Sequence, residues 1–350
     1  MRHRTIFFLV LAVLTAAFGQ QPQAPTPQAP KPAAPAEKAD IVVKVQEVIV
    51  PVTVTDDKGK FVSDLEQKDF QILDEGRPQN ISYFTRERSQ PVVVGFLVDQ
   101  SNAVKLNWKT YMEATTDLIL TLMPGDKKFS GYLIGYGNEA ELAQNTTSDP
   151  EKILAKLRKM KPGGGSSLFD AIYRACTSRD LVKGEPIEPR RVIVIVGDGH
   201  DNSSKHTLDQ VIELAQRNLV TVYAVSTTGY GFVSEGDAIL RRITEETGGR
   251  VEYPLQDVYK DVSGYLSQPS DEGNYALKVG TGGYASAIAS GIYKSIAAVT
   301  GEVTTQYILR YIPEFTEKSA NRAFRRIEVR VELPGVKVRA RKGYYPRDLQ

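Results

Sequence analysis

Two apolar runs, about a hundred positions apart, form the strongest pattern in the chain. Residues 92–98 and 192–197 consist only of valine, isoleucine, leucine, phenylalanine and glycine. Such runs are typical of strands that are buried on both faces, as in a parallel sheet covered by helices. An aspartate follows each run, Asp99 after the first and Asp198 after the second. Because ligands bind at the carboxyl ends of strands in such sheets, the pattern predicts a site where two carboxylates meet.

Helical and strand patterns alternate through the rest of the middle of the chain. Over residues 105–123, for example, apolar residues recur with the helical period, and Pro124-Gly125 ends the pattern. Such alternation is typical of βα units and predicts an α/β fold with a doubly wound, mostly parallel sheet. The other predicted elements are strands over 129–137 and 220–225 and helices over 150–160, 168–178, 207–218, 237–246 and 285–299.

Segments on both sides of this region alternate apolar and polar residues with period two. Residues 48–54 have valine at every second position, and residues 327–333 and 336–340 alternate similarly around Pro334-Gly335. The alternation predicts antiparallel strands with one buried face, and the Pro-Gly turn predicts a hairpin. A further strand is expected over 306–311. Because an isolated hairpin is marginal in water, we expect the N- and C-terminal strands to share one β-sandwich.

These patterns predict an α/β domain inserted into an antiparallel β-sandwich. The α/β domain is expected over residues 91–302, and the sandwich strands over 40–90 and 303–350. Two separate β elements are the alternative to a shared sandwich. Residues 267–283, rich in Gly, Ser and Tyr, match neither pattern and are interpreted as an irregular insertion.

The N-terminal residues predict export. Arg2 and Arg4 precede an apolar stretch, and Ala17-Phe18-Gly19 supplies the small residues that a signal peptidase requires, so residues 1–19 are expected to be a signal peptide. The stretch is short for a membrane span, although an uncleaved anchor is the alternative. Residues 20–39, rich in Gln, Pro and Ala, predict a semi-rigid linker. We therefore expect the protein in the periplasm, the cell envelope or outside the cell, with no transmembrane segment after cleavage.

Charge and cysteine content exclude several kinds of partner and bond. The chain has 44 Lys and Arg against 42 Asp and Glu, a formal net charge of +2. Arg2 and Arg4 supply the excess, so no overall field would direct the processed chain to nucleic acid or an anionic membrane. Cys176 is the only cysteine, which excludes an internal disulfide. A cluster of basic residues near the C-terminus is expected on the exposed face of a strand: Lys337, Arg339, Arg341 and Lys342.

Three polar segments that follow predicted strands or precede a predicted helix resemble a known site. They are Asp99-Gln100-Ser101-Asn102-Ala103, the glycine loop Gly163-Gly164-Gly165-Ser166, and Gly197-Asp198-Gly199-His200-Asp201-Asn202. Their order resembles the metal-ion-dependent adhesion site of von Willebrand factor A (VWFA) domains, in which D-x-S-x-S, a threonine and an aspartate occupy three loops. The flanks resemble the exported acidobacterial VWFA-related family, through Asp69-Phe70, Asp74-Glu75-Gly76, Gln306-Tyr307 and residues 339–345.

The resemblance implies a divalent metal site. Carried over position by position, its ligands are Asp99, Ser101, Ser166 and Asp198. Ala103 stands where the family has its second serine, so one oxygen ligand is missing and weak binding is expected. The implied ion is Mg²⁺, or Ca²⁺ or Mn²⁺, because few carboxylates with hydroxyl and water oxygens suit a hard cation.

The implied function is binding rather than catalysis. A protein partner of unknown identity would present a carboxylate to the bound ion. Residues near the three loops are expected to form the rim that selects this partner: Asn102, Lys105, Tyr136, His200 and Asn202.

Two other functions remain open. A structural protein of the cell envelope would keep the loops as a vestigial site without metal. A metal-assisted hydrolase, or one with a Ser-His-Asp arrangement, would use His200 or His206 beside Asp198. The chain has neither a G-x-S-x-G nor an H-E-x-x-H motif, so we expect no enzymatic activity. Asp170 is expected to be a hydrogen-bond partner rather than a ligand.

Overall fold

The computed structural model describes residues 47–87, 91–105, 108–178, 181, 189–227, 234–254, 289–313 and 324–346. The predicted signal peptide, the predicted linker and the segment 267–283 lie outside these residues. Within the described part of the chain, no helix is both long and apolar enough to span a membrane.

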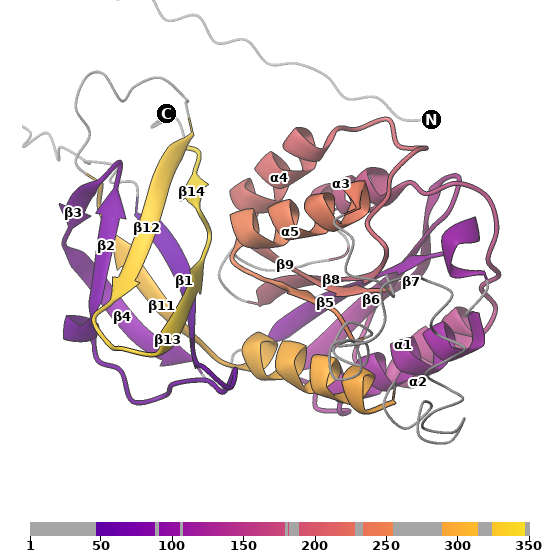
Figure 1. Ribbon diagram of the computed structural model, residues 1–350, viewed down its shortest axis with the longest axis horizontal. Helices are drawn as coiled ribbons and strands as arrows, with labels where there is room; N and C mark the ends of the chain where they lie inside the picture. Colours follow the sequence, from indigo (N-terminus) through magenta and orange to yellow (C-terminus); the bar gives the residue numbers. More distant parts are fainter. Residues whose placement is uncertain are drawn as a thin grey trace, which may run out of the picture. The chain divides into compact units, whose positions relative to one another are not determined.

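A six-stranded sheet forms the centre of the α/β region (Figure 1). Its strand order is β10-β9-β8-β5-β6-β7, and every pair of neighbours is parallel except β6 and β7. The two apolar runs form the adjacent strands β5 and β8, and the predicted mostly parallel sheet is thereby confirmed. The strands are β5 (Val92–Asp99), β6 (Phe129–Tyr136), β7 (Ala140–Thr147), β8 (Arg190–Gly197), β9 (Val220–Ser226) and β10 (Val251–Glu252).

Helices cover both faces of this sheet, with α1, α2 and residues 289–304 on one face and α3, α4 and α5 on the other (Figure 1). Successive side chains of β5 pack alternately on the two faces of the sheet. Val94 and Phe96 belong to the core with α1 and α2, whereas Val93 and Leu97 belong to the core with α3, α4 and α5. The helices are α1 (Trp108–Leu122), α2 (Pro150–Leu157), α3 (Leu168–Thr177), α4 (Leu208–Arg217) and α5 (Glu235–Thr247).

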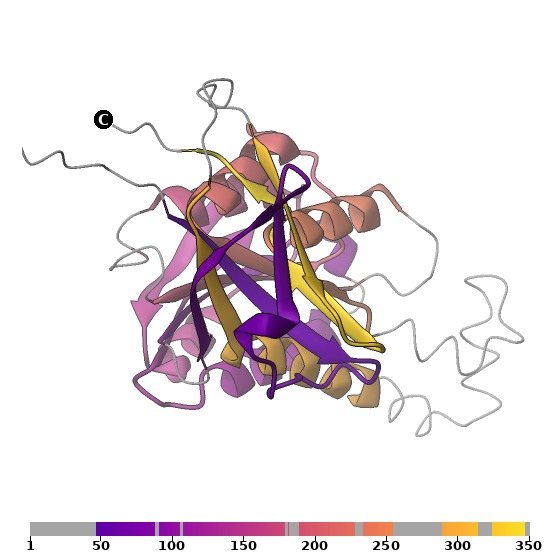
Figure 2. The ribbon, with the colours of Figure 1, turned by 90° about the vertical axis from the view of Figure 1, so that its left-hand side faces the viewer.

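The N- and C-terminal strands form two antiparallel four-stranded sheets, with orders β13-β1-β11-β4 and β14-β12-β2-β3 (Figure 2). The predicted shared sandwich is confirmed, because β1 pairs with β11 and β13, and β2 pairs with β12. The four alternating valines of β1 are buried in one core with Ile72 of β2 and Ile327 of β12. The strands are β1 (Val48–Asp56), β2 (Phe70–Asp74), β3 (Arg77–Gln79), β4 (Ile81–Glu87), β11 (Gln306–Tyr311), β12 (Arg325–Val331), β13 (Val336–Ala340) and β14 (Gly343–Tyr344).

The α/β region is inserted between two strands that pair with each other. β4 precedes it in the sequence and β11 follows it. These strands are antiparallel neighbours, and the backbones of Glu87 and Gln306 are register partners. The chain therefore leaves the sandwich and returns to it at adjacent positions of one sheet.

The predicted C-terminal hairpin is wrong. β12 pairs with β2 and β14, whereas β13 pairs with β1, so the turn at Pro334-Gly335 carries the chain from one sheet to the other. Period-two alternation indicates which face of a strand is buried. Two strands that share this pattern can bury their apolar faces side by side or across a sandwich core, and the pattern alone does not distinguish the two.

The expected exposed face of basic residues is wrong at two positions. Lys337 and Lys342 are exposed, but Arg341 is buried, at 8% exposure. The Arg339 guanidinium donates to Glu302 Oε1 at 2.7 Å, and Arg250 Nη1 lies 3.2 Å from the same oxygen. The alternation of apolar and polar residues predicted that Arg339 and Arg341 face away from the sandwich core. On that side they contact the α/β region instead of solvent.

Candidate functional site

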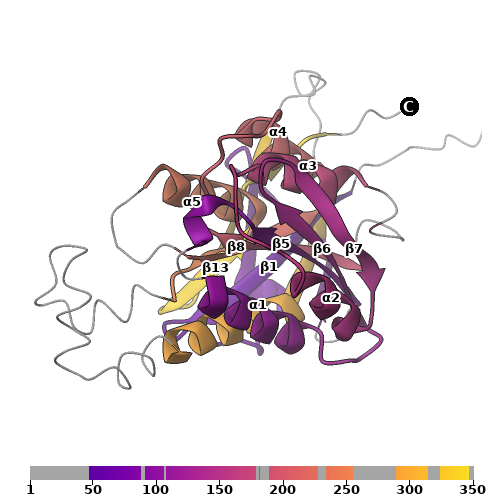
Figure 3. The same cartoon turned by 90° about the vertical axis from the view of Figure 1, so that its right-hand side faces the viewer.

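The candidate site lies where β5 and β8, the two central strands, end. The chain leaves these adjacent parallel strands in opposite directions, from β5 through α1 to β6 and from β8 through α4 to β9. Strands β8, β5, β6 and β7 follow one another across the sheet in Figure 3. A reversal of strand order of this kind opens a crevice at the carboxyl ends of the strands, and loops fill it with side chains.

Asp99 is the last residue of β5 and is fully buried. Its Oδ1 accepts a 2.7 Å hydrogen bond from the backbone N–H of Ser101, whereas Oδ2 is buried and has no hydrogen-bond partner among the described residues. Burial raises the pKa of Asp99 to about 6, and the nearby Asp198 carboxylate adds to the shift. Two effects follow: the charge on Asp99 is costly at neutral pH, and one carboxylate oxygen is available to a ligand.

Backbone hydrogen bonds join the first loop to the glycine loop. The Asn102 N–H donates to the Gly164 carbonyl at 3.1 Å, and the Gly163 N–H donates to the Gln100 carbonyl at 2.6 Å. The Ser101 side chain is buried and accepts a 3.3 Å hydrogen bond from the Ala103 N–H. Both loops are therefore held beside Asp99 by the main chain.

Ser166 is fixed by residues of the third loop. Its N–H donates to Asn202 Oδ1 at 2.9 Å, and its hydroxyl donates to the His200 carbonyl at 2.7 Å. The side chain is 2% exposed. Because the hydroxyl uses its proton on a carbonyl, its oxygen lone pairs stay available to a cation.

The Asp198 carboxylate contacts His200 through both of its oxygens. The His200 N–H donates to Oδ1 at 3.0 Å, and the imidazole Nδ1 lies 3.1 Å from Oδ2. The His200 side chain is half-exposed. Asp198 is therefore oriented at the crevice by the residue that also holds the Ser166 hydroxyl.

Two glycines are required because side chains lie against them. A Cβ at Gly197 would lie 2.2 Å from the Tyr136 hydroxyl oxygen and 3.0 Å from Asp99 Cβ. A Cβ at Gly165 would lie 2.2 Å from the Ser203 hydroxyl oxygen. Both 2.2 Å distances are shorter than a Cβ atom makes in real structures. A larger residue at Gly165 or Gly197 would therefore displace side chains of the site.

Four of the five predicted rim residues are exposed at the loops, namely Asn102, Lys105, His200 and Asn202. The Asn202 side chain also has an internal role, because its Oδ1 accepts hydrogen bonds from Ser166 and Ser203. The prediction for Tyr136 is corrected: it is fully buried, with its hydroxyl 3.4 Å from the Val196 carbonyl oxygen, and cannot contact a partner.

Further polar residues hold the loops. Asp170 accepts hydrogen bonds from the N–H groups of Lys205 and His206 and lies 2.6 Å from His206 Nδ1, the hydrogen-bonding role expected of it. Two residues that hold the loops were not predicted: Asp201 accepts from the Phe169 N–H at 2.8 Å, and Asn138 accepts from the Gly165 N–H at 2.6 Å. Asp201 had a detectable signal, because it opens the polar run Asp201-Asn202-Ser203-Ser204 after a predicted strand; its Oδ1 accepts from the Ser204 N–H at 3.1 Å. Asn138 contacts a loop 27 residues away, and no local pattern indicates such a contact.

The set of candidate ligands fits a hard divalent cation better than a transition metal. The described residues contain no group of three or more His, Cys, Asp and Glu side chains suited to hold a metal ion. The site instead combines the carboxylates of Asp99 and Asp198 with the hydroxyls of Ser101 and Ser166. Oxygen ligands with few charges suit Mg²⁺, and the unpartnered Asp99 Oδ2 provides a strong acceptor for it.

The described contacts do not form a Ser-His-Asp arrangement. The Ser166 hydroxyl donates to the backbone carbonyl of His200, not to its imidazole. The His206 ring stacks on Tyr173, with 3.6 Å between ring centroids, and contacts Asp170. Two Asp–His pairs are thus present, but among the residues that the structure describes neither imidazole hydrogen-bonds to a serine hydroxyl.

The fold and the candidate loops together define an α/β domain with a crevice at its topological switch point. Residues 94–200 match the family model described as von Willebrand factor type A domain. The chain therefore carries a von Willebrand factor type A (VWA) domain. None of the curated proteins compared with the chain matches it.

Several solved structures are similar to the chain at low identity. An aerotolerance-related membrane protein from Bacteroides fragilis is 18% identical, with 49% of this chain and 97% of that chain covered and a TM-score of 0.38. The vWF domain of the type V pili tip protein Mfa5 from Porphyromonas gingivalis is 19% identical, with 32% and 39% covered and a TM-score of 0.29. Proximal thread matrix protein 1 from the mussel byssus, with a zinc-occupied MIDAS motif, is 16% identical, with 51% and 47% covered and a TM-score of 0.39.

Proposed function

We propose that the VWA domain is a non-enzymatic binding module that holds Mg²⁺, or Ca²⁺ or Mn²⁺, between its three site loops. The ligands would be Asp99, Ser101, Ser166 and Asp198. A bound divalent cation would offer an exchangeable coordination position to a carboxylate of a protein partner. The exposed residues Asn102, Lys105, His200 and Asn202 would contact that partner around the ion.

The Asp99 carboxylate carries this proposal. It is fully buried, and one of its oxygens has no hydrogen-bond partner in the described part of the chain. An unneutralised buried carboxylate is costly, because the interior solvates charge poorly. A cation beside Asp99 would remove this cost. The hydroxyls of Ser101 and Ser166 supply further oxygen ligands of the right kind from the two neighbouring loops.

Calorimetric titration with Mg²⁺, Ca²⁺ and Mn²⁺ tests the metal site. We expect weak binding to the native protein and none to Asp99→Ala or Asp198→Ala. Ala103→Ser restores the missing hydroxyl and should tighten binding by roughly tenfold, equivalent to about 1.4 kcal/mol. Asp117→Ala is the matched control, because it removes an exposed carboxylate from α1 and should leave metal binding unchanged.

If no divalent ion binds at millimolar concentration and Ala103→Ser changes nothing, the site is vestigial and a structural role in the envelope becomes the better hypothesis. If metal binds, partner capture from an envelope extract in Mg²⁺ and again in chelator tests the second half of the proposal. A carboxylate-bearing protein partner should be retained in Mg²⁺ and released by chelator. Retention that is equal under both conditions would mean that the ion does not mediate binding.

We further propose that the protein is exported and is related to the acidobacterial VWFA-related proteins. The arginines and apolar stretch of residues 1–19 support export, and the paired N- and C-terminal strands around the VWA domain agree with the relationship. N-terminal sequencing of protein from the cell envelope should begin near Gln20. Protein that retains Met1 and fractionates with the cytoplasm would contradict export.

A further inference from the structure

The amino end of α3 lacks the usual hydrogen bond from its own N-cap residue. Ser167 is this N-cap, but its hydroxyl makes no bond to the helix and has no partner among the described residues. An N-cap side chain ordinarily accepts from the N–H of the second or third helical residue, here Phe169 and Asp170. These two N–H groups therefore need acceptors from elsewhere in the structure.

Asp201 of the third loop and Ser204, two residues after that loop, supply both acceptors. The Phe169 N–H donates to Asp201 Oδ2 at 2.8 Å, and the Asp170 N–H donates to the Ser204 hydroxyl oxygen at 2.9 Å. Asp201 and Ser204 also bond to each other, because the Ser204 N–H donates to Asp201 Oδ1 at 3.1 Å and its hydroxyl donates to Oδ2 at 2.6 Å. The helix is therefore capped by a segment more than 30 positions further along the chain.

The contact between α3 and this segment is reciprocal. Asp170 Oδ1 accepts from the N–H groups of Lys205 and His206, at 3.0 and 3.2 Å. Each element thus supplies a carboxylate that accepts from the backbone of the other. The Asp201 carboxylate also has the sign of charge that is favoured at a helix N-terminus. We call this set of contacts, made by Asp170, Asp201 and Ser204, the α3 clamp.

Ser166, a proposed metal ligand, lies directly beside the α3 clamp. It precedes the N-cap of α3, and its carbonyl accepts from the N–H groups of Asn202 and Ser203, both at 3.0 Å. Its hydroxyl donates to the His200 carbonyl, and its N–H donates to Asn202 Oδ1. Asp201 therefore lies in the chain between the two residues that bond to the Ser166 hydroxyl and N–H.

The hydrogen bonds of Asp201 fit a positioning role better than a ligand role. Both of its carboxylate oxygens accept hydrogen bonds, whereas Asp99 Oδ2 has no partner in the described part of the chain. We infer that Asp201, together with Ser204, is a positioning residue that fixes Ser166 relative to Asp198 by capping α3. For the metal site, this inference rests on the function proposed above. Residues that orient the ligands of a metal affect its affinity without contacting it.

Titration calorimetry with Mg²⁺ tests the inference in two variants. Asp201→Ala removes the cap of α3 together with a charge, and the Mg²⁺ affinity should fall roughly tenfold or more. Ser204→Ala removes two hydrogen bonds of the α3 clamp and no charge, and the affinity should fall in the same direction by less. A fall in Asp201→Ala with none in Ser204→Ala would show that only the lost charge matters, and would overturn the inference.

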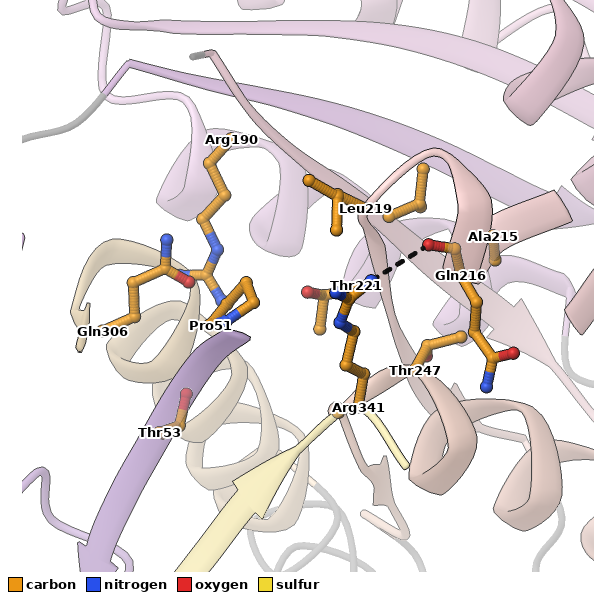
Figure 4. A pocket seen from close by; sticks show the side chains of 12 residues that line it. Pro51, Thr53, Arg190, Ala215, Gln216, Leu219, Thr221, Thr247, Gln306 and Arg341 are labelled. Carbon is orange, nitrogen blue, oxygen red and sulfur yellow. Dashed lines mark hydrogen bonds between the residues drawn. The ribbon is translucent and has the colours of Figure 1, made fainter. Parts of the chain in front are cut away.

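Two control variants separate this effect from a lost cap or a lost stabilising contact elsewhere. Asp149→Ala removes a carboxylate that caps α2, where Asp149 Oδ1 accepts from the Glu151 N–H at 3.0 Å. Gln216→Ala removes the bond that this buried side chain donates to the Glu246 carbonyl at 3.0 Å. Gln216 lines a small cavity at the amino ends of β8 and β9, away from the site loops (Figure 4). Both controls should melt at a lower temperature and keep the Mg²⁺ affinity of the native protein.

Amide hydrogen exchange of the metal-free protein gives a reading that does not depend on the ion. The Ser166 N–H, which donates to Asn202 Oδ1 at 2.9 Å, should exchange roughly fivefold to thirtyfold faster in Asp201→Ala, because a lost cap weakens local structure to that extent. Ser204→Ala should also speed the exchange, and the two controls should not.

Equal exchange of the Ser166 N–H in all five proteins would overturn the inference, as would an Mg²⁺ affinity that is unchanged in Asp201→Ala or equally reduced in a control. If the native protein binds no Mg²⁺ but the Ser166 N–H exchanges faster in the two clamp variants, the proposed metal function fails and the positioning of Ser166 stands. If Asp201→Ala does not fold, Ser204→Ala decides the result by both measurements.

Discussion

At the scale of single residues, some residues of the site loops lower the stability of the fold. Asp99 is placed where burial disfavours its charge, and its pKa is raised to about 6 from an ordinary value of 3.8. Gly197 is placed where any side chain would collide with Asp99 or Tyr136. Other residues at position 99 would therefore stabilise the metal-free protein better than aspartate does. A residue that lowers stability in this way is typical of a position with a functional role.

Asp99→Asn should stabilise the metal-free protein at neutral pH. Between about pH 4 and pH 6 the folded state keeps a proton that the unfolded state has released, so stability falls as the pH rises through this window. Above pH 6 the full cost is present. The shift of about 2 pH units corresponds to at most about 3 kcal/mol. Urea unfolding of both proteins from pH 4 to pH 8, without metal, measures the gain.

The pH profile separates this explanation from a simple packing effect. The variant should show no gain near pH 4 and a growing gain up to about pH 6.5. Mg²⁺ should then stabilise the native protein but not the variant. A gain in stability of the same size at every pH would show that the buried charge of Asp99 is not its cause.

Gly197→Ala should destabilise the protein and abolish metal binding. The added methyl group would lie 2.2 Å from the Tyr136 hydroxyl oxygen and 3.0 Å from Asp99 Cβ, so both must move. Overpacking of this kind costs about 1–3 kcal/mol. Gly301→Ala is the control, because nothing lies within 4 Å of its Cβ position and alanine favours a helix. Denaturant unfolding and metal titration compare the two, and equal effects would count against the contact.

At the scale of elements, sequence patterns predicted what is buried better than what pairs. The two apolar runs became the central strands, because strands covered on both faces need apolar residues at every position. β7 was missed: it lies at the sheet edge, is half-buried or exposed, and has no apolar alternation. The C-terminal hairpin was wrong because alternation does not specify the partner of a strand.

The capping of α4 illustrates a signal that sequence does carry. Thr207 and Gln210 form a reciprocal box, in which the Thr207 hydroxyl accepts from the Gln210 N–H at 3.4 Å and the Gln210 side chain accepts from the Thr207 N–H at 3.0 Å. Thr207→Ala should lower the free energy of unfolding by about 1 kcal/mol. Thr207→Ser keeps the hydroxyl and should be close to neutral. A loss of equal size in both would show that the cap is not the cause.

At the scale of the whole described chain, the sandwich and the VWA domain are joined by buried charges that no pattern indicated. Glu302 is 1% exposed and forms ion pairs with both Arg250 and Arg339. The four candidate metal ligands stay a prediction, which the resemblance of three short segments to the VWFA site loops made possible. The junction could not be predicted, because its residues come from distant segments and look like ordinary surface charges.

Glu302→Ala should be strongly destabilising at this junction. It leaves the Arg339 guanidinium without its carboxylate in a buried place, and it removes one of the two carboxylates that contact Arg250, which costs about 3–5 kcal/mol. Calorimetry should show the loss and should resolve separate transitions for the sandwich and the VWA domain, if Glu302 couples them. Glu332→Ala removes an exposed carboxylate near the same end of the chain and should leave a single transition. A single unchanged transition in both variants would exclude the coupling.

The pairing of β4 with β11 has a consequence for how such a protein can arise and be re-engineered. Glu87 and Gln306 are register partners, and residues opposite each other on antiparallel strands lie only about 5 Å apart. Replacing everything between them with a two-residue turn would leave an ordinary β-hairpin. To the host sandwich, a domain of more than two hundred residues is therefore equivalent to a long hairpin loop. Different binding domains could be exchanged at this point of the chain while the strands that carry them stay the same.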